Sequence, residues 1–301
     1  MLEQPVRYRS RDEDSARWIW FPFRQGDIII STRSKTGTTW VQMICALLIF
    51  QTPELPSTIG RLSPWLDHLV VPRDVLFARL EDQQHRRVIK THTPLDGIAL
   101  DSRATYLVTG RNPLDMAVSL YRQGENIDHA KVRQLTGQPE PAKPEPARKP
   151  LRDWLLEWID NDADPREEMD SLPGVMWHLS DAWERRSEPN IMLIHYDDLS
   201  ADLNGQMRRI ADQLGITVPE QTWPSLVEAA TFQHMKASAD QLLGTGGILK
   251  STAAFFPRGK SGAAREILTE QEIAHYHNRV AQMAPSDMLT WLHSPDRSQR
   301  L

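Results

Sequence analysis

The sequence has 301 residues, of which 40% are hydrophobic and 25% charged, a composition typical of a soluble globular protein. It holds 35 lysines and arginines against 40 aspartates and glutamates, so no overall positive field exists to attract nucleic acid. The longest apolar run, residues 41–50, is too short to span a bilayer, and the charged first residues lack the apolar core of a signal peptide. We therefore expect a cytoplasmic protein without a membrane span or a nucleic-acid partner.

Four short runs in the sequence are predicted to be β-strands: residues 27–32, 86–91, 104–110 and 190–196. Each is apolar along most of its length, as is typical of strands that are covered on both faces. Helical patterns are found at residues 38–50, 113–127, 173–187, 203–216 and 269–283. Strands that alternate with helices predict an α/β fold, here a single domain over residues 1–301 with a central, mainly parallel sheet flanked by helices.

A polar motif follows each of the four predicted strands. These motifs are SKTGTT, KTHTP, GRNP and YDDL, which begin at residues 34, 90, 110 and 196. In a doubly wound sheet, ligands bind beyond the carboxyl ends of the strands. The four motifs are therefore expected to meet at one edge of the sheet and to form one site there.

The first motif, residues 34–39, predicts an anion site. Gly37 lets the backbone turn, and Thr38 and Thr39 begin a helix whose exposed amides and dipole favour negative charge. Lys35 adds a mobile positive charge, but it precedes the glycine, whereas the lysine of a Walker A loop follows its glycine. The alternative interpretation is a tight strand–helix turn with solvated hydroxyl groups.

The second motif contains Lys90 and His92 at the end of a predicted strand. Residues two apart lie on the same side of an extended chain, so the two side chains are expected to face the ligand together. A histidine with an ordinary pKa of about 6.5 is a suitable proton acceptor at neutral pH. A strand-end histidine alone is more often structural, but the neighbouring lysine favours a functional role.

The third motif places Arg111 at the end of a strand and Ser119 on the following helix. Arginine can hold a terminal phosphate with two parallel hydrogen bonds, and a serine hydroxyl can add another donor. The alternative is an ordinary ion pair between Arg111 and Asp115 at the start of the helix.

Other candidate sites do not have the residues that their chemistry requires. Residues 160–171 imitate the start of an EF-hand loop, but Pro165 stands where glycine is required and Ser171 where glutamate is required. No two histidines have the helical spacing of a zinc site, so we expect no bound metal. Four aromatic residues are candidates to line an apolar pocket: Trp18, Trp20, Trp65 and Phe77.

Two segments are expected to differ from the rest of the domain. Residues 137–150 contain five prolines and few apolar residues, which predicts an extended surface insertion. Residues 236–262 contain several glycines followed by Arg258 and Gly259, and we expect them to form a mobile lid over a bound cofactor.

Together the motifs resemble those of the PAPS-dependent sulfotransferases, a cytosolic-type family with many bacterial members. SKTGTTW (34–40) resembles the family's loop P-K-S-G-T-T-W, and KTHTPL (90–95) resembles K-T-H-L-P-L. RNPLDMAVSLY (111–121) resembles R-N-P-K-D-V-A-V-S-x-Y, the 3′-phosphate motif. HYDDLSADL (195–203) and FFPRGKSGAA (255–264) are similar to two further family segments, and all five follow in family order. The stretch QQHRRVIKTHTPLDG is similar to mycobacterial-type members, including ones that act on glycolipids.

This resemblance implies a P-loop-kinase-like sulfotransferase fold and in-line transfer of a sulfuryl group from PAPS to a hydroxyl of a small-molecule or glycolipid acceptor, leaving PAP. It implies that His92 is the general base, that Lys35 stabilises the leaving 5′-phosphate and that Lys90 steadies the sulfonate oxygens. The cofactor-binding residues that it implies are Lys35, Thr36, Gly37, Thr38, Thr39, Trp40, Arg111, Ser119, Tyr196, Phe232, Arg258 and Gly259. Among them, Tyr196 and Phe232 are expected near the adenine.

The sequence departs from the family pattern in the last motif. Pro257 stands where the family usually has arginine, and Ala263 and Ala264 replace an Asp-Trp pair, which implies a weaker lid. This change suggests an alternative function, a non-catalytic module that binds PAP or another nucleotide. A P-loop nucleotide kinase is the second alternative, but the sequence lacks its G-K-[ST] motif and an evident magnesium carboxylate.

Overall fold

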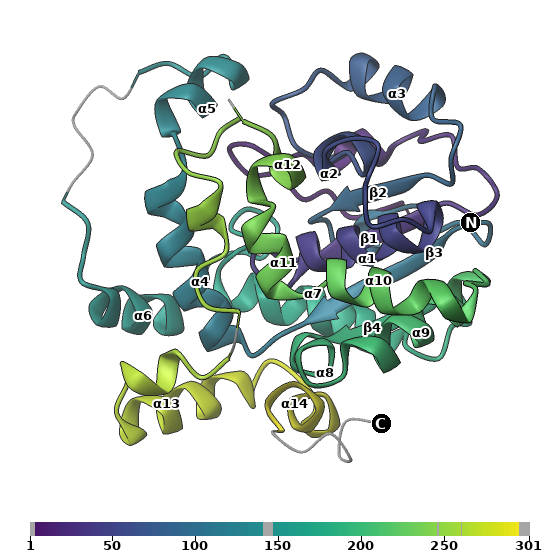
Figure 1. Ribbon diagram of the computed structural model, residues 1–301. Coiled ribbons are helices and arrows are strands. Elements are labelled where there is room, and N and C mark those ends of the chain that lie inside the picture. Colours follow the sequence, from purple (N-terminus) through teal and green to yellow (C-terminus); the bar gives the residue numbers. More distant parts are fainter. Residues whose placement is uncertain (1–3, 141–146, 246, 260, 295–301) are drawn as a thin grey trace.

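The computed structural model describes residues 4–140, 147–245, 247–259 and 261–294, which form a single α/β domain (Figure 1). Its centre is a four-stranded, fully parallel sheet with the strand order β2-β1-β3-β4. The strands are β1 (Ile28–Thr32), β2 (Val88–Thr91), β3 (Thr105–Gly110) and β4 (Ile191–His195). All four predicted strands and the predicted fold class are thereby confirmed.

Helices surround the sheet, and short 3-10 turns join some of them. The first half of the chain contains α1 (Thr38–Phe50), α2 (Ile59–Leu62), α3 (Arg73–Glu81), α4 (Pro113–Asn126), α5 (His129–Thr136) and α6 (Leu151–Asp160). The second half contains α7 (Leu172–Glu184), α8 (Tyr196–Ala201), α9 (Leu203–Leu214), α10 (Trp223–Ala229), α11 (Phe232–Ala237), α12 (Ala239–Leu243), α13 (Glu270–Val280) and α14 (Ser286–His293). The 3-10 turns are η1 (Ser15–Trp18), η2 (Leu95–Gly97), η3 (Glu220–Thr222), η4 (Ala253–Phe255) and η5 (Ala264–Glu266). The five predicted helices correspond to α1, α4, α7, α9 and α13.

Local sequence signals explain where several helices begin. The Asn112 side chain accepts a hydrogen bond from the Leu114 amide, and Pro113 occupies the first turn of α4, where its missing amide costs nothing. At α13, Thr269 and Glu272 form a reciprocal capping box. These caps bind amides that would otherwise have no partner at the helix ends.

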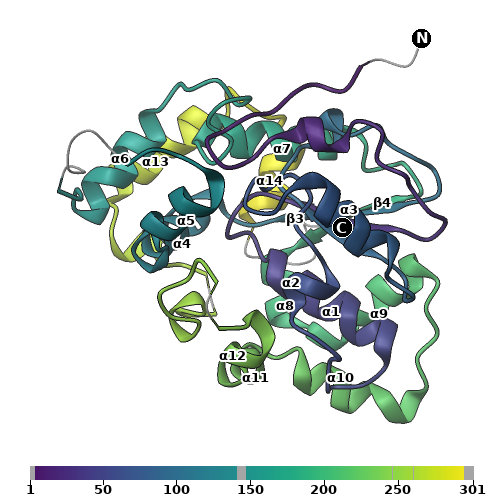
Figure 2. The same cartoon turned by 90° about the horizontal axis from the view of Figure 1, so that it is seen from above.

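The sheet is covered on both faces, as the apolar strands require. All five residues of β1 are buried. Ile28 and Ile30 pack with α1, α9 and α10, whereas Ile29 belongs to a second cluster that includes Trp18 and Phe21 of the N-terminal segment. A third cluster joins α4, α6, α7, α13 and α14 (Figure 2). The alternation along β1 follows from the period of two in a strand.

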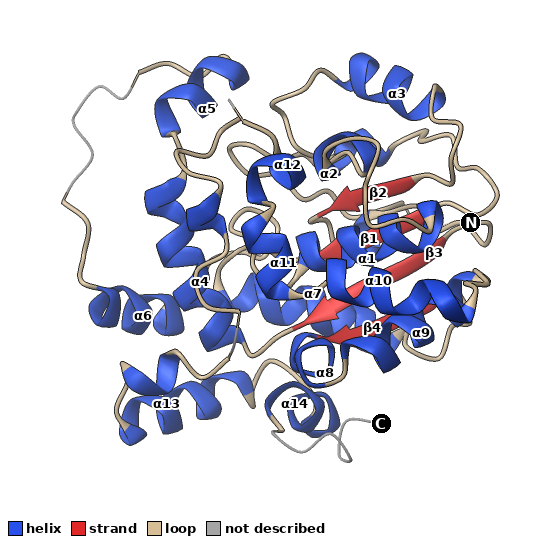
Figure 3. Cartoon of the chain, in the orientation of Figure 1, coloured by secondary structure: helices blue, strands red, loops and turns tan. Residues whose placement is uncertain are grey.

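All four strands point the same way, toward the side of the molecule where α4 and α11 lie (Figure 3). Residues at the strand ends are therefore neighbours across the sheet: Ile30 pairs with Lys90, and Gly110 pairs with His195. The loops that carry the four polar motifs leave from this edge, which confirms that one edge of the sheet collects them.

The Pro-rich insertion expected at residues 137–150 lies partly outside the described residues, since residues 141–146 are not described. Gln138, Pro139 and Glu140 before the gap and residues 147–150 after it are mostly exposed, as expected of a surface segment. Within the described part of the chain, no helix has both the length and the apolar character needed to cross a membrane.

A buried ion pair links the start of β1 to the start of β2. The Arg87 side chain donates hydrogen bonds of 2.8 and 2.6 Å to the two carboxylate oxygens of Asp27, and both side chains are 2% exposed. Asp27→Ala would leave the guanidinium buried without its anion, so we expect the free energy of unfolding to fall by about 3–5 kcal/mol. Urea unfolding measures this loss.

The control for this prediction is Glu220→Ala, which removes an exposed pair with Arg208. Exposed ion pairs contribute little, so the control is expected to unfold almost like the wild type. Equal urea midpoints for both variants would contradict a structural role for the Asp27–Arg87 pair.

Candidate active site

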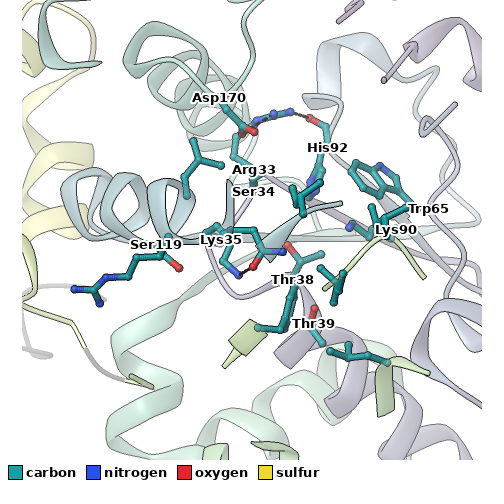
Figure 4. A pocket seen from close by; sticks show the side chains of 18 of the residues that line it. Arg33, Ser34, Lys35, Thr38, Thr39, Trp65, Lys90, His92, Ser119 and Asp170 are labelled. Atoms are coloured by element: carbon teal, nitrogen blue, oxygen red, sulfur yellow. Dashed lines mark hydrogen bonds and ion pairs between the residues drawn. The ribbon is translucent and has the colours of Figure 1, made fainter. Parts of the chain in front are cut away.

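The carboxyl edge of the sheet opens into a cavity of about 1350 Å³ (Figure 4). Nearly all residues that the resemblance implicates line it: Lys35, Gly37, Thr38, Thr39, Trp40, Lys90, His92, Arg111, Ser119, Tyr196, Phe232, Arg258 and Gly259. The exception is Thr36, which is buried and whose hydroxyl donates to the Arg33 carbonyl at 2.8 Å. The side chain of Thr36 therefore supports the loop from behind.

The prediction that four aromatic residues line an apolar pocket is wrong for three of them. Trp65 lines the cavity, but Trp18 is buried in the core against Phe21 and Phe23. Phe77 also packs edge-on against Phe21, and Trp20 is 90% exposed. Apolar character alone did not reveal which of these rings face the cavity.

The loop between β1 and α1 has the backbone of an anion site. Gly37 immediately precedes α1 with φ 115°, and a Cβ atom built there would come within 3.1 Å of the Tyr196 ring. Lys35 also has a left-handed backbone, with φ 65°. Among the residues that the structure describes, no side chain caps the start of α1, so the first amides of this helix are available to a ligand at its positive end.

Lys35 extends from this loop into the cavity. Its Nζ atom lies 4.0 Å from the centre of the Phe255 ring and 3.4 Å from the Gln123 side-chain oxygen. Burial, together with the positive charges of Arg111 and Lys90, lowers the pKa of Lys35 to about 7. An anion bound beside this lysine would raise its pKa and restore the ammonium form.

Lys90 lies over the ring of Trp65, with its Nζ atom 3.6 Å from the ring centre. The Trp65 ring also stacks on His68 at 4.0 Å and meets His92 edge-on at 4.5 Å. Burial lowers the pKa of Lys90 to about 8, while the nearby Glu13 carboxylate opposes that shift. Trp65 thus fixes the positions of a cation and an imidazole side by side in the cavity wall.

His92 is held as a neutral imidazole with a defined tautomer. Its Nδ1 atom contacts the Thr32 carbonyl oxygen, which can only accept, so Nδ1 carries the proton. The Nε2 atom is therefore the basic nitrogen of the ring. Burial, followed by the charges of Lys90 and Arg33, lowers the pKa of His92 well below 6.5.

Two residues that sequence reasoning missed hold the backbone of this histidine. One carboxylate oxygen of Asp67 accepts hydrogen bonds from the His92 amide at 3.1 Å, the Thr93 amide at 3.0 Å and the Thr93 hydroxyl at 2.6 Å. The Arg33 guanidinium donates to the His92 carbonyl at 2.5 Å. Asp67 is the last residue of the stretch SPWLD (63–67), and Arg33 directly precedes the SKTGTT motif.

Arg111 contacts the same loop from β3. It donates to the Lys35 carbonyl at 3.1 Å, and its guanidinium lies 4.2 Å from the centre of the Tyr196 ring. The alternative ion pair with Asp115 is wrong, because the Asp115 carboxylate accepts the amides of Gly262 at 2.8 Å and Ala264 at 3.3 Å. The Nε atom of Arg111 is buried without a hydrogen-bond partner among the described residues.

The segment expected to cover the cofactor brings Gly259 against Phe232. Gly259 has φ 69°, and a Cβ atom there would lie 2.5 Å from the Phe232 ring, so only glycine fits. Arg258 lines the cavity, but its guanidinium is bound to both carboxylate oxygens of Glu266 at 2.7 and 2.8 Å. To contact a phosphate, Arg258 must either break its ion pair with Glu266 or bind both anions at once.

The sequence from residue 25 to residue 287 matches the family model described as the sulfotransferase domain. The chain belongs to this family. The sulfotransferase is 38% identical over 312 residues to a glycolipid sulfotransferase of Mycobacterium bovis, covering 97% of this chain and 95% of that protein. It is also 38% identical over 311 residues to a glycolipid sulfotransferase of Mycobacterium tuberculosis, with the same coverage of both chains.

Solved structures share the fold of the sulfotransferase. A retinol dehydratase in complex with androsterone and inactive cofactor PAP has a TM-score of 0.70 at 19% identity, covering 94% of this chain and 86% of that one. A mouse sulfotransferase complexed with PAP has a TM-score of 0.66 at 18% identity, covering 89% and 87%. Across the residues that the structure describes, no three His, Cys, Asp or Glu side chains are grouped to hold a metal ion.

The low pKa of Lys35 predicts how stability changes with pH. An unfolded lysine has a pKa of about 10.4, so between about pH 7 and pH 10 the unfolded chain binds more protons than the folded one. The free energy of unfolding is therefore expected to rise with pH across this window, and to rise less steeply in Lys35→Met. Urea unfolding at several pH values measures both slopes.

The matched control is Lys149→Met, which removes an exposed lysine outside the cavity lining. This variant should keep the wild-type slope. If Lys35→Met keeps it too, the buried lysine does not titrate in this window, which would contradict the prediction.

Proposed function

We propose that this sulfotransferase uses PAPS as its donor and moves the sulfuryl group to a hydroxyl of a small-molecule or glycolipid acceptor, with His92 as the general base. The single observation that carries this proposal is the basic Nε2 atom of a neutral His92 beside Lys90 in the wall of the cavity. Binding alone requires no such base, so this arrangement favours an enzyme over a non-catalytic module.

The cavity suits a nucleotide that carries two phosphate groups. The start of α1 offers amides to a 5′-phosphate, and the unpartnered Nε atom of Arg111 and the Ser119 hydroxyl suit a 3′-phosphate. Tyr196 and Phe232 offer aromatic faces for the adenine. When bound, PAPS supplies an activated sulfuryl group on its 5′-phosphate.

The side chains have complementary roles in the proposed reaction. His92 Nε2 takes the proton of the acceptor hydroxyl while its oxygen forms a bond to sulfur and the bond from sulfur to the 5′-phosphate oxygen breaks. Lys35 donates a hydrogen bond to that leaving oxygen, and Lys90 binds the sulfonate oxygens as their charge is redistributed. Both lysines need their ammonium forms, which the anionic donor restores.

The relatives that are named glycolipid sulfotransferases support the proposed acceptor class. The cavity is large enough for a nucleotide and an acceptor together, because it exceeds the usual range of single-ligand pockets of about 300–1,000 Å³. Apolar side chains in its wall, such as Ile127, Val132 and Trp154, suit the lipid part of such an acceptor. The cytoplasmic location expected from the sequence stays a prediction.

The test of this proposal is transfer of ³⁵S from labelled PAPS into lipid extracts and a panel of phenols. Turnover should survive EDTA and be inhibited by PAP. Binding of PAP without transfer to any acceptor would instead support the non-catalytic module. Phosphoryl transfer from ATP that depends on magnesium would support the kinase.

Loss of the base should affect the chemical step more than binding. His92→Ala is expected to lower kcat by about 10²–10⁴ while PAP binding stays nearly unchanged. Steady-state kinetics measure the first effect and calorimetry the second. A variant that loses PAP affinity without a separate defect in kcat would show that His92 is not the base.

Arg111 is predicted to select the donor by its 3′-phosphate. Arg111→Ala should remove most of the preference for PAPS over APS, which lacks this phosphate, because a hydrogen bond to a charged group contributes roughly 1.5–3 kcal/mol, or about 10- to 150-fold. Competition between PAPS and APS measures the ratio, with Arg208→Ala as an exposed arginine control. An unchanged ratio would remove Arg111 from the donor site.

We also propose that the expected lid, residues 236–262, becomes more ordered when the cofactor binds. Ordering costs about 1–2 kcal/mol of backbone entropy per residue, which contacts with phosphate must offset. Hydrogen exchange should therefore slow in this segment when PAP is added, most of all near Arg258. Equal protection with and without PAP would mean that the segment is already ordered and that no lid exists.

A further inference from the structure

A cluster of buried charges forms part of the cavity wall next to His92. Arg33, which is 2% exposed, reaches the Asp170 carboxylate at 2.7 Å and the His92 carbonyl at 2.5 Å, as Figure 4 shows. Glu13 of the N-terminal segment also lines the cavity and is 6% exposed. The proposed transfer assigns no role to Glu13 or Asp170.

One oxygen of Glu13 is left without a hydrogen bond. Its Oε2 atom lies 3.7 Å from the nearest Arg33 nitrogen, which is close enough for an ion pair and too long for a hydrogen bond. The same atom is buried and has no hydrogen-bond partner within the described ranges. Burial raises the pKa of Glu13 to about 8, as expected of a carboxyl group that the protein leaves poorly satisfied.

A second unsatisfied group lies beside the same histidine. The indole N–H of Trp65 is buried and lacks an acceptor among the residues described, although Trp65 lines the cavity and meets His92 edge-on. Buried polar atoms of proteins almost always have a partner, so each exception calls for one. The wall around His92 thus offers one unused acceptor, on Glu13, and one unused donor, on Trp65.

We propose that Glu13 and Trp65 form a subsite for a sugar ring of the acceptor, whose neighbouring hydroxyls bind the carboxyl group and the indole N–H while another hydroxyl is sulfated. The inference rests on the proposed function and names the part of the acceptor that is recognised. In an acceptor with a single hydroxyl, that hydroxyl is bound to His92, so the Glu13 oxygen and the Trp65 indole N–H stay without a partner. A sugar has several hydroxyls, each of which donates and accepts, and can pair both.

The position of Asp170 and Arg33 explains how the subsite keeps its shape. Arg33 is fixed between Asp170 and the His92 carbonyl, so the Glu13 carboxyl group faces a guanidinium that is held in place. A role of Glu13 limited to holding Arg33 would affect every acceptor equally. A sugar subsite would affect only acceptors that carry a sugar, and this difference separates the two roles.

The experiment compares octyl β-D-glucopyranoside with 1-octanol, which share an alkyl chain and differ by the sugar. We expect Glu13→Ala to lower the ratio of kcat/KM for octyl glucoside to that for 1-octanol by about 2- to 13-fold, the loss of a hydrogen bond to an uncharged group, because its raised pKa leaves the Glu13 carboxyl group largely protonated at neutral pH. The effect should fall mainly on KM. Glu13→Gln keeps one carbonyl oxygen and should lose less.

The matched control is Glu81→Ala, which removes an exposed glutamate that pairs with Arg24 outside the cavity lining. It should keep the wild-type ratio. An equal loss with both acceptors in Glu13→Ala would overturn the inference, since the residue would then only support the fold. Wild-type sulfation of 1-octanol but not of octyl glucoside would overturn it as well.

A binding measurement keeps the inference separate from the proposed function. Saturation-transfer NMR can detect octyl glucoside on the PAP-loaded protein, with 1-octanol as the reference ligand. A signal for the sugar protons that is lost in Glu13→Ala and kept in Glu81→Ala would support the subsite, even if no transfer to either acceptor were found. The absence of transfer would count against the proposed function instead. Equal sugar signals in both variants, or no sugar signal from the wild type, would overturn the subsite.

Discussion

Repulsion among buried cations is the constraint on which the site depends. The positive charges of Arg111 and Lys90 both act on Lys35, whose ammonium form is already disfavoured by burial. A protein keeps such a group only where something else offsets the cost. In the proposed function, the anionic donor supplies this counter-charge. Pre-organisation of this kind is the main source of electrostatic stabilisation in enzymes.

His92, the proposed base, lies in the same electrostatic field, and this explains its surroundings. An imidazole next to buried cations stays neutral, and the Thr32 carbonyl selects the tautomer in which Nε2 accepts. Asp67 accepts a hydrogen bond from the His92 amide and Arg33 donates one to the His92 carbonyl, so both backbone polar groups of His92 are held in place. In the proposed reaction, the negative charge of the bound donor would favour protonation of His92, so donor binding would precede proton transfer.

The fold and the main site residues could be predicted from the sequence because the positions of side chains at strand ends depend on local sequence patterns. A period of two and a parallel sheet are enough to bring Lys90, His92 and Arg111 to one edge. The roles of Glu13 and Asp67 were not accessible, because their partners lie far along the chain and no local pattern links them. Nor does composition reveal orientation: Trp20 is exposed on a left-handed turn.

Helix α4 has a mechanical consequence for the segment that crosses the cavity. Near its end, Asn126 binds the backbone of Ser251, and near its start, Asp115 binds the amide of Gly262. Because the segment is bound to α4 at both of these points, its middle can move away from the cavity, but the segment cannot rotate away as a rigid unit. The nucleotide would then enter and leave beneath this segment, and the length of α4 sets the distance between its two attachment points.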